Sequence, residues 1–299
     1  MSAAGELTLR PVARPGEHRF ATAAGRMLVL GLALTASFAQ TRPVDPLALA
    51  RDAYNAQRYD VAISRADEAR KIPASADAAS VVFARAHLER YRVNPDPADL
   101  IDARAALKQV DATKLSARDH LEYLIGLGES IFLDDGFVLD DRYGAAAELF
   151  ELALSRGDAL DTKSRDLLFE WWALSLDRQA QQGPDADRPP IYERVVRRAE
   201  QELARPEGAV SASYWLAAGA RGTGDLARAM GAAAAGWTRA ASMGARGEAL
   251  RNDLDQLVLL VILPERAKEI TTAGDPRTTL AYLQRQWTEF KAKWEKTGS

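Results

Sequence analysis

The sequence predicts an all-helical protein built from short antiparallel helix pairs stacked in a row, an α-solenoid. Three observations lead to this fold class. Apolar residues recur at three- to four-residue spacing, and no stretch alternates apolar and polar residues as a half-buried strand would. Pro, Gly, Asp and Asn interrupt that spacing at short intervals. An isolated short pair cannot bury its apolar face, whereas stacked pairs can.

The spacing and its interruptions predict the individual helices in order along the chain. They fall at residues 46–57, 60–72, 76–91, 97–110, 116–133, 143–156, 164–181, 190–204, 209–222, 225–241, 248–262, 265–272 and 276–296. Two of these starts carry a clear local signal. Asp96 offers a side-chain oxygen to the first turn, and Pro97 lacks an N–H that would have no partner there. Ser116 followed by Asp119 resembles a capping box.

Residues 1–39 predict a secretory signal peptide. Four arginines precede the apolar run 27–34, and small residues stand at Ser37 and Ala39. A basic flank, a short apolar core and a small-x-small exit are typical of a signal that is cleaved, here after Ala39. We therefore expect an exported protein, periplasmic or secreted, without stable membrane insertion after cleavage. An uncleaved anchor is the alternative, although the apolar core 27–39 is short for a membrane span.

The composition excludes several classes of function. Hydrophobic residues make up 47% of the chain and charged residues 27%, which is typical of a globular protein. With a formal net charge of −3 and no basic run, the chain is a poor match for nucleic acid or for an anionic membrane surface. Because there is no cysteine, disulfides, thiolate metal sites and a cysteine nucleophile are excluded.

Three segments share an internal pattern, in which a Leu–small pair is followed by small residues at three- to four-residue spacing in the next helix. Residues 47–73 contain Leu49-Ala50, Tyr59, Ala62, Ala66 and Ala69; residues 124–154 contain Leu127-Gly128, Tyr143, Ala146, Phe150 and Ala153; residues 213–240 contain Leu216-Ala217, Leu226, Ala229, Ala233 and Gly236. This pattern resembles the tetratricopeptide repeat, whose small residues let the two helices of a pair cross closely. Segments 81–110 and 171–203 match it less well, and the early tryptophan of the motif is missing from every repeat.

The resemblance implies a right-handed solenoid over residues 40–242, with a concave groove lined by the first helix of each pair. We expect residues 243–299 to form an irregular helical C-terminal cap continuous with it. In this cap the apolar run 257–263 is predicted to be a helix buried on all sides. Carried onto the matching positions, the family's groove residues are Arg51, Tyr54, Glu129, Phe132, Ala218 and Arg221.

No group of residues stands out as a catalytic or metal site, and we expect neither an enzyme nor a cofactor. His87 and His120 lack the spacing of metal ligands. Ser116 and Asp119 lie close to His120 but without a nucleophile elbow, so a helix cap is the better interpretation. The loop 134–141 holds four carboxylates, whose spacing favours solvated turn and cap residues over a calcium site.

The leading hypothesis is a cell-envelope scaffold or adaptor that binds a protein partner through the concave groove. An alternative is an envelope protein that binds a small apolar or carbohydrate ligand in a closed pocket, lined by Trp171, Trp172, Trp215 and Trp237. A third hypothesis is an enzyme on a helical array, which predicts a cleft with converging carboxylates of perturbed pKa. An open groove favours the first hypothesis, and an enclosed aromatic pocket favours the second.

Overall fold

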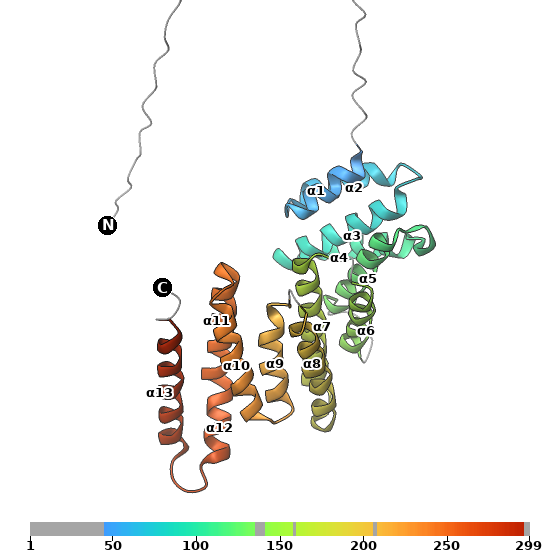
Figure 1. The fold of residues 1–299 in the computed structure, drawn as a ribbon. Helices are drawn as coiled ribbons and strands as arrows, with labels where there is room; N and C mark the ends of the chain where they lie inside the picture. The colour runs from blue at the N-terminus through green and yellow to red at the C-terminus, as the bar shows by residue number, and fades with distance from the viewer. Residues whose placement is uncertain (1–44, 135–140, 158–159, 206–207, 296–299) are drawn as a thin grey trace, which may run out of the picture. The chain divides into compact units, whose positions relative to one another are not determined.

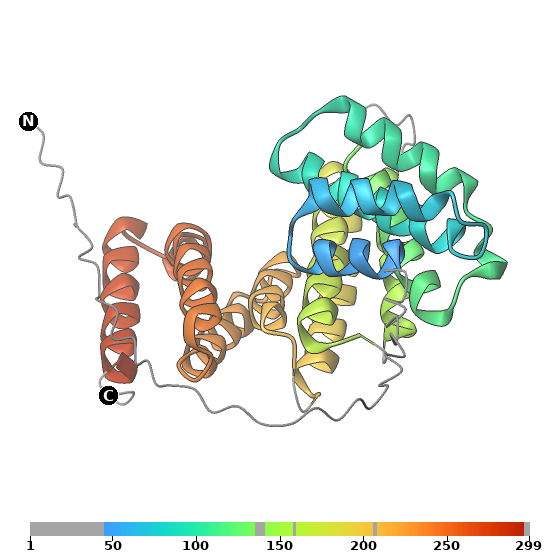
Figure 2. The ribbon, with the colours of Figure 1, turned by 90° about the horizontal axis from the view of Figure 1, so that it is seen from above.

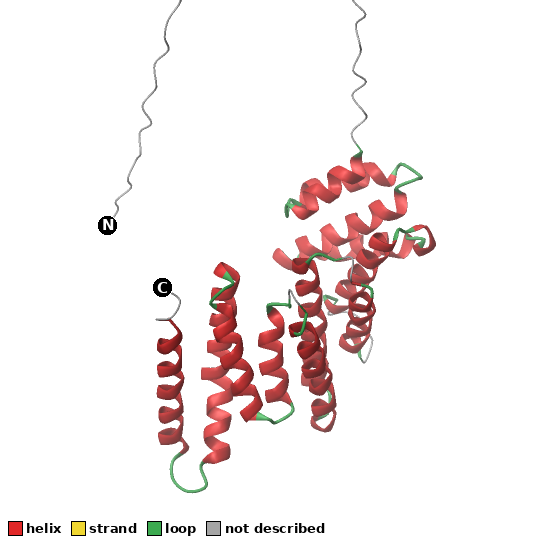
Figure 3. Ribbon diagram, in the orientation of Figure 1, coloured by secondary structure: helices red, strands yellow, loops and turns green. Residues whose placement is uncertain are grey.

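The computed structural model describes residues 45–134, 141–157, 160–205 and 208–295, and these are helical with no strand among them (Figures 1 and 3). The prediction of an all-helical chain is therefore confirmed for the described residues. The chain divides into two units, Met1–Arg42 and Pro43–Ser299. The predicted signal peptide, residues 1–39, lies outside the described residues. Within the described part, no helix combines the length and the apolar character needed to cross a membrane.

The second unit consists of helices joined by short connections. Their bounds are α1 (Pro46–Asn55), α2 (Tyr59–Arg70), α3 (Ala76–Val93), α4 (Pro97–Gln109), α5 (Ala117–Phe132), α6 (Arg142–Ser155), α7 (Thr162–Gln182), α8 (Arg188–Leu203), α9 (Ser211–Gly222), α10 (Leu226–Ala240), α11 (Gly244–Leu257), α12 (Leu263–Ile270) and α13 (Pro276–Glu295). A π-helical turn, η4 (Val258–Ile262), connects α11 directly to α12. Short 3₁₀ turns lie at Ala112–Lys114 and Asp185–Asp187.

Polar side chains fix the starts of several helices. The Asp96 carboxylate accepts a hydrogen bond of 3.0 Å from the Ala98 N–H at the start of α4. The Ser116 hydroxyl accepts one of 3.2 Å from the Asp119 N–H at the start of α5, and it donates to the Asp119 carboxylate at 2.7 Å. Each bond satisfies an N–H that the first turn of a helix leaves without a partner. Both predicted caps are thus confirmed.

Two kinds of contact arrange the helices of this unit. Neighbouring helices in the chain pack as pairs, for example α1 with α2, α5 with α6 and α9 with α10. In addition, each odd-numbered helix from α1 to α9 contacts the next odd-numbered helix, so that α1, α3, α5, α7, α9 and α11 follow one another in a row. Figure 2 shows the same helices from above. The face of this odd-numbered row carries the site described below.

Small residues allow the paired helices to approach closely. A Cβ atom on Gly128 of α5 would lie 2.6 Å from the ring of Phe150 of α6, and Phe150 is fully buried. Phe150 belongs to a core cluster that also contains Phe169, Trp171 and Trp172 of the described chain. At Gly128, therefore, the small residue lets α5 and α6 approach closely.

Candidate functional site: a groove between α7, α9 and α11

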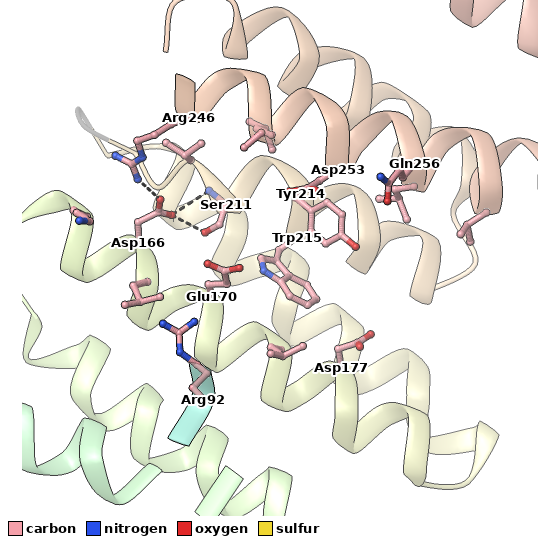
Figure 4. A pocket seen from close by; sticks show the side chains of 18 of the residues that line it. Arg92, Asp166, Glu170, Asp177, Ser211, Tyr214, Trp215, Arg246, Asp253 and Gln256 are labelled. Atoms are coloured by element: carbon pink, nitrogen blue, oxygen red, sulfur yellow. Dashed lines mark hydrogen bonds and ion pairs between the residues drawn. The ribbon is translucent and has the colours of Figure 1, made fainter. Parts of the chain in front are cut away.

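A groove of about 820 Å³ opens on the odd-numbered row (Figure 4). Helix α9 packs against both α7 and α11, and it supplies the floor between them. Side chains of α7 and of α11 with η4 form the two walls. At one end the groove is bordered by Gln57, after α1, and by Arg92 of α3. Segments that are far apart in the sequence thus meet around one space.

Helical periodicity places the wall residues. Along α7 the lining positions are 163, 166, 167, 170, 174 and 177, and they follow one stripe of the helix. The side chain of Asp161 fixes the start of α7 by accepting from the Ser164 N–H at 3.0 Å. Along α11 and η4 the lining positions 246, 249, 250, 253, 256, 257, 260 and 261 also follow one face.

The floor is aromatic and one end of the groove is aliphatic. Tyr214 and Trp215 of α9 meet edge to face, with ring centroids 5.3 Å apart. Trp215 is buried and Tyr214 is half-buried. Beside them Leu257, Leu260 and Val261 line the wall, and the exposed fraction of Leu260 is 73%. A large aliphatic side chain left in water beside a groove is a surface that a ligand could cover.

The exposure of Leu260 corrects one prediction. The run 257–263 was expected to be buried on all sides, but only Val258, Ile262 and Leu263 of that run are buried. Pro264 changes the local helix, because a proline cannot donate to the carbonyl four residues earlier, here that of Leu260. The chain widens instead into a π-helical turn, in which the Leu263 N–H donates to the Val258 carbonyl. Such turns are frequent at functional sites.

Four carboxylates lie along the groove, and two of them have partners. Asp166 accepts from the Ser211 N–H at 3.0 Å, from the Ser211 hydroxyl at 2.6 Å and from Arg246 at 2.5 Å. Asp177 accepts from the Tyr192 hydroxyl at 2.8 Å. These contacts tie α7 to α8, α9 and α11 and set the shape of the groove.

The other two carboxylates, Glu170 of α7 and Asp253 of α11, make no ion pair or hydrogen bond with the described residues. Both side chains are exposed to water within the groove. The surrounding protein atoms nevertheless remove part of their hydration, which affects their pKa values. Desolvation raises the pKa of Glu170, and the charges of Asp166 and Asp253 raise it further, against Arg92. Desolvation also raises the pKa of Asp253. An added positive charge would relieve this repulsion.

Comparison with protein-family models, with curated proteins and with solved structures finds no match for the chain. The chemistry of the groove therefore rests on its own residues.

A second part of the same row, between α1, α3 and α5, is closed by buried charges. Arg85 of α3 donates to the Tyr54 hydroxyl at 2.8 Å, pairs with Glu122, and has its Nε 3.1 Å from a Glu129 oxygen. Arg92, two turns further along α3, is exposed and donates twice to Glu89, at 3.1 and 2.6 Å. We call Tyr54, Arg85, Glu89, Glu122 and Glu129 the buried charge network, which Arg92 joins at its exposed edge. The space beside it is only about 40 Å³.

Glu129 lies deepest in this network, with an exposed fraction of 1%. Burial, together with the charges of Glu89 and Glu122, raises its pKa to about 7, although Arg85 opposes that rise. Burial likewise raises the pKa of Tyr54. The network therefore holds one buried carboxyl whose pKa is raised well above its ordinary value.

The six residues carried over from the repeat family lie outside the large groove. Arg51 pairs with Asp119 at 2.5 Å, and it lines the small space together with Tyr54. Glu129 belongs to the buried charge network. Phe132 packs edge to face on Tyr143 and Trp171, Ala218 packs against the central core, and Arg221 holds Glu265 through two bonds of 2.9 and 2.5 Å. The sequence did not indicate Glu170, Asp253 or Tyr214 as site residues. These three side chains line one groove only because α9 packs against both α7 and α11.

Of the four tryptophans proposed for a closed pocket, Trp215 lines the groove. Trp171 and Trp172 belong to the central core, beside Phe150 and Phe169. Trp237 packs edge to face on Trp287, with ring centroids 5.7 Å apart, in the C-terminal core. The structure therefore does not bring the four together around one space.

The remaining candidates make local contacts. The His87 ring lies 2.6 Å from the Asp99 carboxylate, which also accepts from Arg90, and His120 lies 3.1 Å from Arg156. Residues 135–140 of the acidic loop lie outside the described part. Of its described ends, Asp134 pairs with Arg104, while Asp141 caps α6 and accepts from Gln179. Among the described residues, no three or more His, Asp or Glu side chains are grouped as metal ligands.

Proposed function

We propose that this protein is an exported, tetratricopeptide-like adaptor of the cell envelope, which binds an extended segment of a protein partner in the groove between α7, α9 and α11. The observation that carries the proposal is the groove itself. It has about 820 Å³ of open space with an aromatic floor, an exposed aliphatic wall and two carboxylates without a partner in the described chain. Such a surface combines apolar contact area with a few placed polar groups.

The order of helix contacts supports the solenoid part of this proposal. In a right-handed solenoid of helix pairs, the first helices stack on one another and line the concave face. The contacts from α1 through α3, α5, α7 and α9 to α11 have this order. The groove lies on that row, where solenoids bind their partners.

The openness of the groove favours a protein segment over an enclosed small ligand. A drug-sized or sugar ligand is usually held in a pocket that buries most of its surface. Here Leu260 and Leu167 on the walls are exposed, and Trp171, Trp172 and Trp237 pack elsewhere. An extended chain could lie along the groove and cover both walls.

A second candidate function draws on the same carboxylates. A pair of carboxyl groups with raised pKa in a cleft is also what a hydrolase would use as acid and base. Both groups are exposed to water, however, so the site lacks the dry environment that makes such chemistry efficient. If Glu170→Gln leaves binding intact but allows uncleaved ligand to accumulate, the hydrolase replaces the adaptor.

Site-specific photo-crosslinking of the full chain in its native cells tests the adaptor function. The crosslinker replaces Gln256, which is exposed on the groove wall, and in a matched control it replaces Ala105, which is exposed on α4. We expect a discrete protein adduct from position 256 alone, and its loss when Leu260→Asp is added. No adduct from the groove, or the same adducts from both positions, would contradict the proposal.

The export part has its own test. The full chain is expressed in a Gram-negative bacterial host, and the N-terminal residue of the accumulated protein is determined by mass spectrometry. Release of the chain outside the cytoplasm with Gln40 as its first residue supports the predicted signal. A membrane-bound chain that retains residues 1–39 favours the uncleaved anchor, and a cytoplasmic chain contradicts export.

A further inference from the structure

Building on the proposed function, we infer that the bound segment carries a lysine or arginine whose cationic head lies between Glu170 and Asp253, with its apolar stem against Tyr214. Figure 4 shows Glu170 on α7 and Asp253 on α11, with Tyr214 and Trp215 of α9 between them. The inference deepens the adaptor function by naming the chemistry of the partner.

The distribution of charge in the groove carries the first step. Asp166 is neutralised by Arg246, and Asp177 has the hydrogen bond from Tyr192. Arg92 at one end of the groove donates to Glu89, although its charge also acts on Glu170, and Lys163 lines the wall beside Asp166. Glu170, Asp177 and Asp253 therefore form no ion pair with a described cation, and of these three only Glu170 and Asp253 also lack a hydrogen bond.

Glu170 and Asp253 face the same space from opposite walls of the groove (Figure 4). The charge of Asp253 contributes to the raised pKa of Glu170, and it contributes, after burial and Asp177, to the raised pKa of Tyr214. Asp253 therefore acts across the groove on both the opposite wall and the floor. A cation placed there would interact with both carboxylates at once, which is favourable in a partly desolvated space.

The aromatic floor decides which kind of cation fits. A long side chain with an apolar stem and a charged head can lay its stem on an aromatic ring while its head reaches the carboxylates. A bare divalent ion would instead need several oxygen ligands, and no such group of carboxylates occurs among the described residues. Lysine and arginine meet both requirements.

The aliphatic end of the groove adds a second feature of the segment. Leu257, Leu260 and Val261 continue the wall beyond Asp253, one to two turns along the chain. An extended segment that places its cation at Asp253 would bring a neighbouring side chain to this end. We therefore expect an apolar residue close to the lysine or arginine.

Selection from a displayed library of random short peptides tests the inference on the full chain. Wild type is compared with Glu170→Gln/Asp253→Asn and with the control Asp102→Asn/Glu248→Gln, which removes two exposed carboxylates outside the groove. We expect wild type and the control to enrich peptides with a lysine or arginine beside an apolar residue. The groove variant should bind a selected peptide about tenfold more weakly, in proportion to the loss of a charge pair of modest strength.

The outcomes separate this inference from the function on which it rests. If groove-dependent peptides are enriched without a basic residue, the adaptor function stands and the inference is overturned. If no peptide depends on the groove, as judged by Leu260→Asp, both are overturned. Equal binding by the groove variant and the control also overturns the inference, because the two carboxylates would then make no specific contact.

Discussion

The N-terminal and C-terminal parts of the odd-numbered row place charged residues at the same helical spacing, but the first part is closed and the second is an open groove. On α3, Arg85, Glu89 and Arg92 lie at steps of four and three residues, and on α7 Asp166, Glu170 and Asp177 lie on a similar stripe. Arg85 and Glu89 of the first stripe are buried in the buried charge network, and Arg85 lines a space of only about 40 Å³, whereas Arg92 reaches the end of the large groove. The second borders a groove of about 820 Å³.

The sign of the charges accounts for the difference. The α3 stripe alternates basic and acidic residues, and α5 brings Glu122 and Glu129 to face Arg85. The helices can therefore close on each other with their charges paired. The α7 stripe is acidic, and α11 brings Asp253 toward it, so closure would bury like charges at a cost of several kcal/mol. Charge sign thus separates a closed interior from an open groove.

The largest effect on stability is expected from removing Arg85, the cation of the buried charge network. Arg85→Met leaves Glu129 and Glu122 without their main partner, and Glu129 is buried. We expect the free energy of unfolding in urea to fall by about 3–5 kcal/mol. The control Arg228→Met breaks the exposed pair with Glu200 and should cost less than about 1 kcal/mol. Equal losses would mean that burial of the network does not matter.

The pH dependence of stability sharpens the same point. Burial raises the pKa of Glu129 from its ordinary value of 4.5 to about 7, so the folded state binds this proton more tightly than the unfolded state. The stabilisation is complete below about pH 4.5 and is lost as the pH rises to about 7. Glu129→Gln should remove this loss, which is of the order of 3 kcal/mol, and flatten the profile measured by urea unfolding.

Glu202 supplies a control of opposite sign. Burial alone would raise the pKa of Glu202, but its bonds with Arg165 and Arg198 outweigh that effect and lower it. Its contribution to stability is present above its unfolded pKa and is lost in acid. Glu202→Gln should therefore destabilise the protein at neutral pH. The proposed difference between the two carboxyls is wrong if both substitutions shift the profile in the same direction.

Close helix packing should matter less than the charges but still be measurable. Gly128→Ala places a Cβ atom 2.6 Å from the Phe150 ring, so α5 and α6 must separate, at a cost of about 2 kcal/mol. In the C-terminal part, a Cβ atom added to Gly231 of α10 would have no neighbouring atom within 4 Å. Gly231→Ala should stabilise the protein by about 0.5–1 kcal/mol, through helix propensity. Thermal unfolding of both variants checks the contrast.

Local signals account for what could be predicted from the sequence. The caps at Asp96 and Ser116 and the Leu–small pair at Gly128 act within a few residues or within one helix pair, so residue type and spacing are sufficient. The exposure of Leu260 was missed because this side of the helix lines the groove, which hydrophobicity alone does not reveal.

The groove could not be predicted because it depends on which helices meet. The family pattern carries Arg51, Tyr54 and Glu129 to the odd-numbered row, but in a part of it that Arg85 closes. Neither Glu170 nor Asp253 stands in a local sequence pattern that indicates a site. Their relation arises from α9, which packs against both α7 and α11 across a long stretch of sequence.

The pH dependence of peptide binding by the groove extends the comparison from stability to function. Because the pKa values of Glu170 and Asp253 are raised, both lose their charge at a higher pH than ordinary carboxyls. Binding of a selected basic peptide should be strongest above these values and should fall about tenfold as the pH drops through them, measured by fluorescence anisotropy. Glu170→Gln/Asp253→Asn should bind weakly and equally at every pH. A wild-type profile without this fall would mean that the open part recognises its partner by apolar contact alone, and the contrast of charge between the two parts would then not extend to function.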